Sequence, residues 1–289
     1  MSVKKVRKVV LPVGGLGTRF LPATKSMPKE MLPVFNKPII QYAFEEAVQA
    51  GIEEFIFITG RNKNAITNHF DHAYELQQVL SSKSKATELE LTKGWIPQAG
   101  QIAFIRQQEP LGLGHAVWCA RNFIGDEPFA VILADELLKL PPRGFLSEML
   151  ESYNQSGSNV NMVGVSEVPE DQTNKYGIIS YEQSGERLKI SDMVEKPNPE
   201  DAPSNLAIIG RYILQPEIFD YLEKQEKGSG GEVQLTDAMA KLRDDQDFYA
   251  LKFNGERFDC GSPIGYLDAN ISFGYDCHPD EVKEILKKY

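Results

Sequence analysis

The sequence predicts an α/β fold in which helices flank a central sheet that is mixed but mostly parallel. Buried apolar runs alternate with helical patterns over residues 1–156, and strand-like segments dominate residues 157–262. Alternation of this kind is typical of parallel strands joined by crossover helices, as in a Rossmann-like fold. With 289 residues, of which 42% are hydrophobic, the chain is long enough to bury a substantial core.

The first half begins with a β-branched run at residues 9–13, which leads into a cluster of glycines. A helical pattern, with apolar residues three and four positions apart, covers residues 40–48 and stops at Gly51, a residue type common at helix ends. Further strands are predicted over residues 55–59, 102–106 and 129–134, with a helix over residues 64–80 and a loop over residues 81–93.

The second half is predicted to be a smaller β region followed by helices. Its strands are expected at residues 160–168, 177–182 and 188–194, with a turn at Ser184-Gly185, and its helices at residues 216–225, 235–242, 263–275 and 279–288. Residues 228–231 are predicted to be a loop. We therefore expect one domain over residues 1–289, with regions 1–156, 157–262 and 263–289. The last helix is amphipathic and fits an oligomer contact.

Composition excludes several classes of partner. The net charge of -10 and the pI near 5.1 argue against a broad grip on nucleic acid or on an anionic membrane, because both require a basic face. A local cluster of Lys and Arg can still hold one small anion inside an acidic protein. We expect no nucleic acid and no membrane among the partners.

The cysteines and the start of the chain predict a cytoplasmic protein. Cys119, Cys260 and Cys277 are odd in number and lack the CxxC spacing of zinc sites and redox dithiols. The apolar run after the basic start is too short for a signal sequence. No apolar stretch approaches the roughly 18 residues of a membrane span.

The most informative segment is GGLGTRFLPATKSMPK at residues 14–29, directly after the first strand. Glycines let backbone N–H groups approach a polyphosphate closely, and two cations in the segment offset its charge. The segment is not a Walker P-loop and lacks the third glycine of a dinucleotide fingerprint. The glycines alone would fit an ordinary turn equally well. The residues selected for an anion site are Gly14, Gly15, Gly17, Thr18, Arg19 and Lys29.

The whole segment resembles the signature GxGTRxxPxT(x)₄K of the sugar-1-phosphate nucleotidyltransferases. Its longer form, LGTRFLPATKxxPKEMLPV, is similar to the members of that family that transfer a uridylyl group. The resemblance continues in order through most of the chain. The other matching segments are GLGHAVxCA at residues 112–120, GDEPFAVIL at 125–133, VEKPxPExAPSNLAIxGRYIL at 194–214, GGEVQLTDA at 230–238 and DCG at 259–261.

Two aspartates match the metal-binding positions of the family. Asp135 follows the fourth predicted strand, where open α/β sheets present their ligands, although an aspartate there is by itself more often a cap or turn residue. The resemblance implies that Asp135 and Asp259 hold a Mg²⁺ ion between the phosphates of two substrates. Family members commonly have Asp-Asp or Asp-Val where this chain has Asp135-Glu136. Glu136 is therefore either an indirect ligand or a solvated side chain.

A second set of residues matches the sugar-binding positions of the family. In its EKP element, here Glu195 and Lys196, the carboxylate accepts hydrogen bonds from sugar hydroxyls and the ammonium contacts the phosphate. An isolated Glu-Lys-Pro would instead be a solvated pair before a turn. Tyr176, Gly177 and Glu232 are also implied to contact the sugar. A strand start for Gly177 and a helix cap for Glu232 are equally good alternatives.

Gln107 lies five residues before Gly112, as does the pair that reads a pyrimidine base in this family. An amide offers a donor and an acceptor to a base edge, and a glycine lets the ring approach the backbone. The neighbouring Gln108 is the alternative, and we choose Gln107 by its spacing. His115 lies in the same motif, but a lone histidine at a helix start is more often structural.

The resemblance implies an enzyme that uses Mg²⁺ to join UTP and glucose 1-phosphate by direct displacement, as a homodimer or homotetramer. Its catalytic residues would be Arg19, Lys29, Asp135 and Lys196. One alternative is the same reaction with dTTP or another nucleotide. Another is a catalytically silent regulatory relative, in which the GTR triplet tends to be disrupted; here it is intact. The absent third glycine disfavours a nicotinamide-dependent oxidoreductase.

Overall fold

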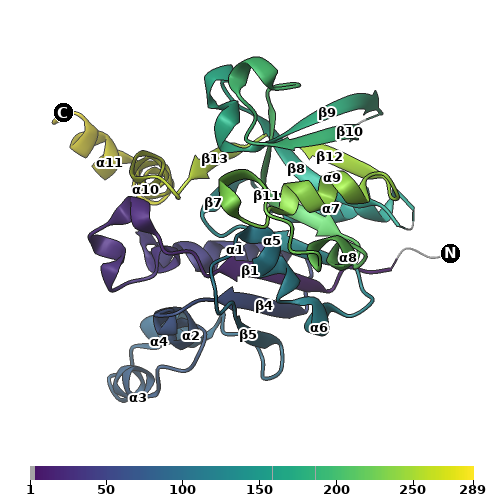
Figure 1. Cartoon of the computed structure of the whole chain (residues 1–289). Coiled ribbons are helices and arrows are strands. Elements are labelled where there is room, and N and C mark those ends of the chain that lie inside the picture. Colours follow the sequence, from purple (N-terminus) through teal and green to yellow (C-terminus); the bar gives the residue numbers. More distant parts are fainter. Residues whose placement is uncertain (1–3, 158, 186) are drawn as a thin grey trace.

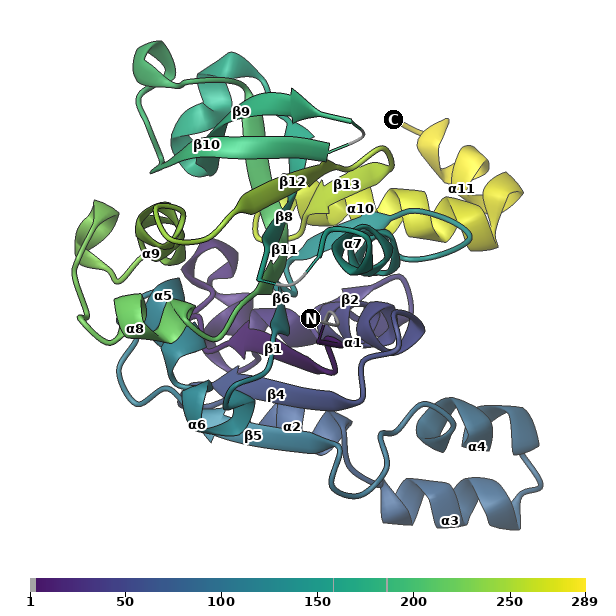
Figure 2. The ribbon, with the colours of Figure 1, turned by 90° about the vertical axis from the view of Figure 1, so that its right-hand side faces the viewer.

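A nine-stranded sheet runs through the molecule, with helices on both faces (Figure 1 and Figure 2). The computed structural model describes residues 4–157, 159–185 and 187–289. The strands, in their order across the sheet, are β5 (Ile102–Arg106), β4 (Glu54–Thr59), β1 (Lys8–Val13), β6 (Phe129–Ile132), β11 (Leu206–Leu214), β8 (Asn161–Glu167), β12 (Phe248–Lys252), β10 (Arg187–Glu195) and β9 (Gly177–Ser184).

The two halves of the chain build the two sides of this one sheet. Strands β5, β4, β1 and β6 are parallel, as the alternating pattern predicts. From β6 onward the neighbours are antiparallel, except for the parallel pair β8 and β12. The predicted mixed α/β fold with flanking helices is confirmed, but parallel pairs do not predominate, because the β-rich second half continues the first sheet mostly with antiparallel strands.

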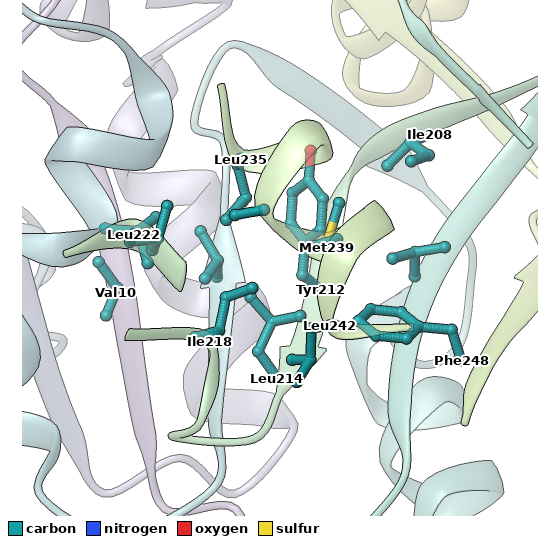
Figure 3. Packing of buried hydrophobic residues seen from close by; sticks show 14 of the residues in the cluster. Val10, Ile208, Tyr212, Leu214, Ile218, Leu222, Leu235, Met239, Leu242 and Phe248 are labelled. Atoms are coloured by element: carbon teal, nitrogen blue, oxygen red, sulfur yellow. The ribbon is translucent and has the colours of Figure 1, made fainter. Parts of the chain in front are cut away.

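The sheet is buried on both faces by two apolar layers. Alternate residues of β1 point to opposite layers, so Val10 lies in one core and Val9 and Leu11 lie in the other. Figure 3 shows the first core, where Tyr212 and Leu214 of β11 meet Met239. Its helices are α5 (Leu113–Trp118), α6 (Arg121–Ile124), α8 (Ile218–Leu222) and α9 (Leu235–Leu242).

The second core lies under helices from the first half of the chain. They are α1 (Ile39–Gln49), α2 (Asn64–His69) and α7 (Phe145–Asn154). A third, smaller cluster joins α10 (Pro263–Cys277) to two short ladders, and α11 (Pro279–Leu286) follows it. The ladders are β7 (Glu136–Lys139) with β13 (Glu256–Asp259), and β2 (Pro33–Val34) with β3 (Lys37–Pro38). No helix among the described residues is both long and apolar enough to cross a membrane.

Two predictions for residues 64–93 are wrong. The single helix predicted over residues 64–80 is two helices, α2 and α3 (Tyr74–Ser82). The chain leaves α2 at Phe70, which is buried in the core, and Asp71 Oδ1 then accepts the backbone N–H of His72, a local bond that competes with helix. The predicted loop over residues 81–93 contains α4 (Ala86–Lys93), whose Ala, Glu, Leu and Lys residues favour helix.

A buried ion pair joins several of these elements. The fully buried Arg211 of β11 donates to Glu46 of α1, with 2.7 Å between Nη2 and Oε2. The same guanidinium donates to the carbonyls of Leu133 and Glu136, at 3.3 and 2.9 Å. Glu46 also accepts the N–H of Leu146 in α7, at 3.1 Å. One pair thereby fixes α1 and α7 against the turn that follows β6.

Removing the arginine should be strongly destabilising. Arg211→Met leaves the Glu46 carboxylate buried without a counter-charge, and we expect the free energy of unfolding to fall by about 3–5 kcal/mol. Adding Glu46→Leu should restore part of this loss, because no unpaired charge then remains. Lys5→Met, at the exposed Lys5–Glu53 pair, is the control and should cost less than about 1 kcal/mol. Denaturant unfolding measures all three, and an Arg211 effect as small as the control would contradict the argument.

Candidate active site

The glycine-rich segment folds tightly over the end of β1. Gly17 has a φ of +67°, and its carbonyl accepts the hydroxyl of Thr24 at 2.7 Å. A Cβ atom at Gly17 would be strained and would lie 3.3 Å from Lys29 Cβ. A Cβ atom at Gly60, after β4, would lie 2.9 Å from the carbonyl oxygen of Gly14. Close backbone packing therefore shapes this loop, and the residues of it that are left exposed include Gly15, Thr18 and Arg19.

Lys29 reaches from this loop to the turn after β6. Its Nζ atom forms an ion pair with Asp135 Oδ2. Burial would lower the pKa of Lys29, but the negative charges of Asp135 and Glu30 and the hydrogen bond to Asp135 together raise it. Burial would likewise raise the pKa of Asp135, and Lys29 lowers it instead. Both groups are therefore charged at neutral pH.

A second ion pair anchors the same loop. Glu30, next to Lys29, is buried and accepts from Lys63 at 2.7 Å, directly before α2. Burial raises the pKa of Glu30, and the charges of Lys63 and Lys29 oppose that rise. Sequence reasoning missed this pair. Its only signal was the position of Glu30 inside the matching PKEMLPV text.

The side chains of Asp135 and Asp259 lie close to the same position, next to Gly261. Asp259 ends β13 and stands opposite Glu136, the first residue of β7. A Cβ atom at Gly261 would lie 2.9 Å from Asp259 Oδ1, 3.1 Å from Asp135 Oδ2 and 3.3 Å from Arg19 Nη1. The two predicted metal ligands therefore face the same small space as Arg19, and only a glycine leaves that space open.

The donor set at this point fits a hard divalent cation. No group of three histidine, cysteine or carboxylate side chains gathers at metal-binding spacing in the part of the chain that is described. Mg²⁺ is usually held by one or two carboxylates, with substrate phosphates and water completing its octahedron. The side chains of Asp135 and Asp259 match that protein share, because their carboxylate oxygens are the ligand type that Mg²⁺ prefers.

Glu136 is neither solvated nor open to a metal. Arg257 of β13 donates to both of its carboxylate oxygens, at 2.7 and 2.8 Å, and the Glu136 side chain is 12% exposed. The Arg257 guanidinium also lies over the Tyr176 ring, 4.6 Å from its centre. Sequence reasoning missed Arg257, whose only signal is its place two residues before Asp259. This arginine connects the turn after β6, which carries Asp135, to the predicted sugar-binding residues.

Those predicted sugar-binding residues gather where β9 and β10 meet α9. Gly177 pairs with Glu195 across the two strands, and a Cβ atom at Gly177 would lie 2.9 Å from Thr236 Oγ1 and 3.2 Å from Glu195 Oε2. The Lys196 N–H donates to the Tyr176 carbonyl at 2.9 Å, and Lys196 Nζ lies 3.2 Å from Glu195 Oε1. Lys196 has a φ of +50°, a strained value for a non-glycine residue and one common at functional sites.

The two glutamines after β5 have different environments. Gln107 is buried, whereas Gln108 is exposed. The Nε2 atom of Gln107 donates to the carbonyl of Gly112 at 3.1 Å and lies 2.9 Å from His115 Nδ1. Its Oε1 atom would lie 3.0 Å from a Cβ atom at Gly14. Gln107 is therefore the glutamine whose side chain faces the glycine-rich loop.

Gly112 joins this region to the segment before α9. It has a φ of +111°, and a Cβ atom there would lie 2.7 Å from the Val233 carbonyl oxygen and 2.8 Å from Glu232 Cβ. The Val233 N–H donates to the Leu111 carbonyl at 2.7 Å. The Glu232 side chain is exposed, and α9 starts after Gln234 without a side-chain cap. The capping alternative for Glu232 is therefore wrong.

Taken together, these contacts close into a ring. Lys29 contacts Asp135, and the next residue, Glu136, is joined to Tyr176 through Arg257. Gly177, which follows Tyr176, lies against Thr236, and the nearby segment 232–233 lies against Gly112. Gln107 contacts Gly112 and faces Gly14, in the loop that carries Lys29. The ring connects predicted site residues from both halves of the chain. Its contacts link Gln107, the glycine-rich loop, the turn with Asp135 and the strands that carry the Glu195–Lys196 pair.

A large acidic cavity lies away from this ring. It measures about 720 Å³ and lies beside α8, the end of α9 and the start of β12. Carboxylates dominate its lining over Lys224 and Arg243, so a polyphosphate would be repelled there. These carboxylates are Glu217, Asp220, Asp244, Asp245 and Asp247.

The fold and this ring define a nucleotidyltransferase. Residues 8–273 match the family model described as nucleotidyl transferase, and the chain belongs to that family. The UTP--glucose-1-phosphate uridylyltransferase of Bacillus subtilis (strain 168) is 52% identical over 272 residues, which are 94% of this chain and 92% of that protein.

Two solved structures are similar over nearly the full length. A UTP-bound UGPase from Acinetobacter baumannii is 42% identical with a TM-score of 0.88, and the match covers 98% of each chain. A UDP-glucose pyrophosphorylase complexed with UDP-glucose is 41% identical with a TM-score of 0.85, and the match covers 94% of this chain and 99% of that one.

The Lys29–Asp135 pair predicts a pH-dependent stability difference. Because the folded-state pKa of Asp135 lies below its ordinary value, the pair stabilises the fold above about pH 4 and loses this effect as the pH falls through the lowered pKa. The wild type should therefore be more stable than Asp135→Asn at neutral pH, and the difference should shrink in acid. Urea unfolding of both proteins at stepped pH measures this. A difference that grows in acid would contradict it.

Proposed function

We propose that this chain transfers a uridylyl group from UTP to glucose 1-phosphate, with UDP-glucose and pyrophosphate as products. The observation that carries the proposal is the ring of contacts, which links the glycine-rich loop and two carboxylates to a Glu-Lys pair through Glu136, Arg257 and Tyr176. The name of the Bacillus subtilis relative, and the UTP and UDP-glucose in the titles of the two similar structures, support the same substrates.

The nucleotide would bind at the ends of β1 and β5. Gln107 and Gly112 are proposed to contact the base, since the Gln107 side chain faces the glycine-rich loop and donates to the Gly112 carbonyl, so the two residues lie together. The triphosphate would lie against the loop, where backbone N–H groups and cations are available without side-chain bulk. The proposed triphosphate contacts are Gly14, Gly15, Gly17, Thr18, Arg19 and Lys29.

The sugar phosphate would bind across the ring. Glu195 is a pure acceptor for sugar hydroxyls, and Lys196 is a compact cation for the phosphate. Tyr176, Gly177 and the exposed Glu232 complete the proposed sugar contacts. The Glu195–Lys196 pair holds both groups ready before any ligand binds.

The reaction requires positioning and charge more than proton transfer. An oxygen of glucose 1-phosphate forms a bond to the α-phosphorus of UTP, the bond from that phosphorus toward the β-phosphate breaks, and pyrophosphate leaves. A phosphate monoester, whose second pKa is about 6, is already mostly a dianion at neutral pH. Arg19, Lys29 and Lys196 are proposed to offset the repulsion between the two anions and to stabilise the charge on the leaving group.

A divalent cation, for which we propose Mg²⁺, would be held by Asp135 and Asp259. When bound, it would supply positive charge to the phosphate groups of both substrates. Lys29 holds Asp135 as a carboxylate in the free protein and would share it with the metal. Arg19 reaches the same space from the loop.

The C-terminal region is proposed as the contact of a homodimer or homotetramer. Helices α10 and α11 pack on each other and expose large apolar side chains, of which Ile264 is the most exposed at 77%.

The regions of the chain and its location are also proposed. Residues 1–156 would bind the nucleotide, residues 157–262 would bind the sugar phosphate, and the protein would be cytoplasmic. The location is supported by Cys119, Cys260 and Cys277, which are free thiols.

A substrate panel tests the proposed reaction. Pyrophosphate release should be fastest with UTP and glucose 1-phosphate when UTP, dTTP, CTP and ATP are each offered with several sugar phosphates and Mg²⁺. Asp135→Ala should lower the rate by at least about 10²-fold, by analogy with the loss of one preorganised charge contact. Release that is fastest with dTTP would change the assigned nucleotide. Near wild-type turnover of Asp135→Ala would remove it from the metal site.

Lys196→Ala should separate the two substrates. We expect weaker binding of glucose 1-phosphate and unchanged binding of UTP, because Lys196 lies on the sugar side of the ring. Isothermal titration with each ligand measures this. Lys189→Ala removes an exposed lysine from β10, the strand that directly precedes Lys196; Lys189 is paired with Asp247, and this variant is the matched control. Weakened UTP binding with intact sugar-phosphate binding would contradict the division.

A further inference from the structure

Both amide hydrogens of Gln107 are already used within the protein. The Gly112 carbonyl can only accept, so the amide atom 3.1 Å from it must be Nε2. The second hydrogen on Nε2 faces His115 Nδ1 at 2.9 Å. These two contacts fix which way the amide points, with nitrogen toward Gly112 and His115 and oxygen away from them.

This arrangement also fixes the state of His115. Its Nδ1 must carry a lone pair to accept from the amide, so the ring proton lies on Nε2 and the imidazole is neutral. Burial lowers the pKa of His115; Glu109 raises it and Arg121 lowers it further. The ring is held in place by stacking on Trp118, with centres 5.7 Å apart, and the Arg121 guanidinium covers Trp118 at 3.5 Å.

The Gln107 oxygen remains available for a ligand. Oε1 faces the backbone of Gly14, and no donor among the described residues forms a hydrogen bond to it. The amide therefore presents only an acceptor on its ligand side. Uracil and thymine carry an N–H at ring position 3, whereas cytosine carries a lone pair there and would be repelled.

We propose that His115 is a positioning residue for base selection: its Nδ1 holds the Gln107 amide so that Oε1 faces the base, which favours UTP over CTP. This inference rests on the proposed role of Gln107 in reading the base. It extends that role, because it makes the orientation of the amide depend on a neighbouring imidazole. His115 touches neither substrate in this arrangement.

An isosteric pair of variants tests the inference. His115→Asn keeps an acceptor close to the position of Nδ1, and His115→Leu has the same shape without it. The readout is the ratio of kcat/KM for UTP to that for CTP in pyrophosphate release, with the KM for glucose 1-phosphate measured alongside. The leucine variant should lose about five- to tenfold in this ratio, the effect of one hydrogen bond, with the asparagine variant near wild type. The KM for glucose 1-phosphate should not change in either.

Two results would overturn the inference: an unchanged UTP/CTP ratio in His115→Leu, or equal losses in both variants. Because His115→Leu can also disturb folding, the wild-type protein is tested directly. Nitrogen-15 NMR of the histidine rings, with the His115 signals assigned by their absence in His115→Asn, should show a neutral ring protonated on Nε2 at neutral pH. A proton on Nδ1 in the wild-type protein would overturn the inference whatever the variants show.

Gln107→Leu separates this inference from the proposed function. If it lowers the UTP/CTP ratio while His115→Leu does not, Gln107 reads the base and the role of His115 is wrong. If Gln107→Leu keeps the ratio, the proposed base site itself is wrong, and the inference falls with it. If neither nucleotide supports pyrophosphate release in the wild type, the proposed function fails whatever the NMR spectrum shows.

Discussion

Arg211 carries a charge into the centre of the sheet, where Glu46 of α1 pairs with it. Its guanidinium also donates to the carbonyls of Leu133 and Glu136, which flank Asp135. A buried arginine must satisfy its donors, and the backbone of this turn supplies the acceptors. The position of Asp135 therefore depends on a pair formed in the core. The positive φ of Gly210, at the bulge in β11, lets that strand pass close to Leu133.

A second arginine couples the two halves of the site. Arg257 forms a bidentate pair with Glu136 and covers the ring of Tyr176, so the turn after β6 and the start of β9 share one planar cation. Planar guanidinium groups suit both a carboxylate and an aromatic face, which a lysine could not match at once. The net charge of -10 is that of the whole chain. Within the ring, Lys29, Lys196 and Arg257 each pair with a carboxylate.

Local patterns predicted the parts of the fold whose signals are local. The β-branched runs of β1, β4 and β5 were predicted to within a residue or two, and α9 was predicted with its observed bounds. The same approach missed β11, β12, β13, β7 and α7. The run LAIIGRYIL of β11 is buried at every position, so it has no alternation to mark it as a strand. The break at Phe70 depended on burial against the core, which no helical pattern shows.

By itself, the sequence determined which short motifs stand out: the glycine-rich loop, the two aspartates and the Glu-Lys pair, which the ring of contacts connects. Only the tertiary structure distinguished Gln107 from Gln108, because Gln107 is buried and contacts His115 whereas Gln108 is exposed. It also gave Glu136 its partner, Arg257, which lies 121 residues away. Spacing along the chain reports neighbours within one element, whereas pairing across the fold depends on where whole strands meet.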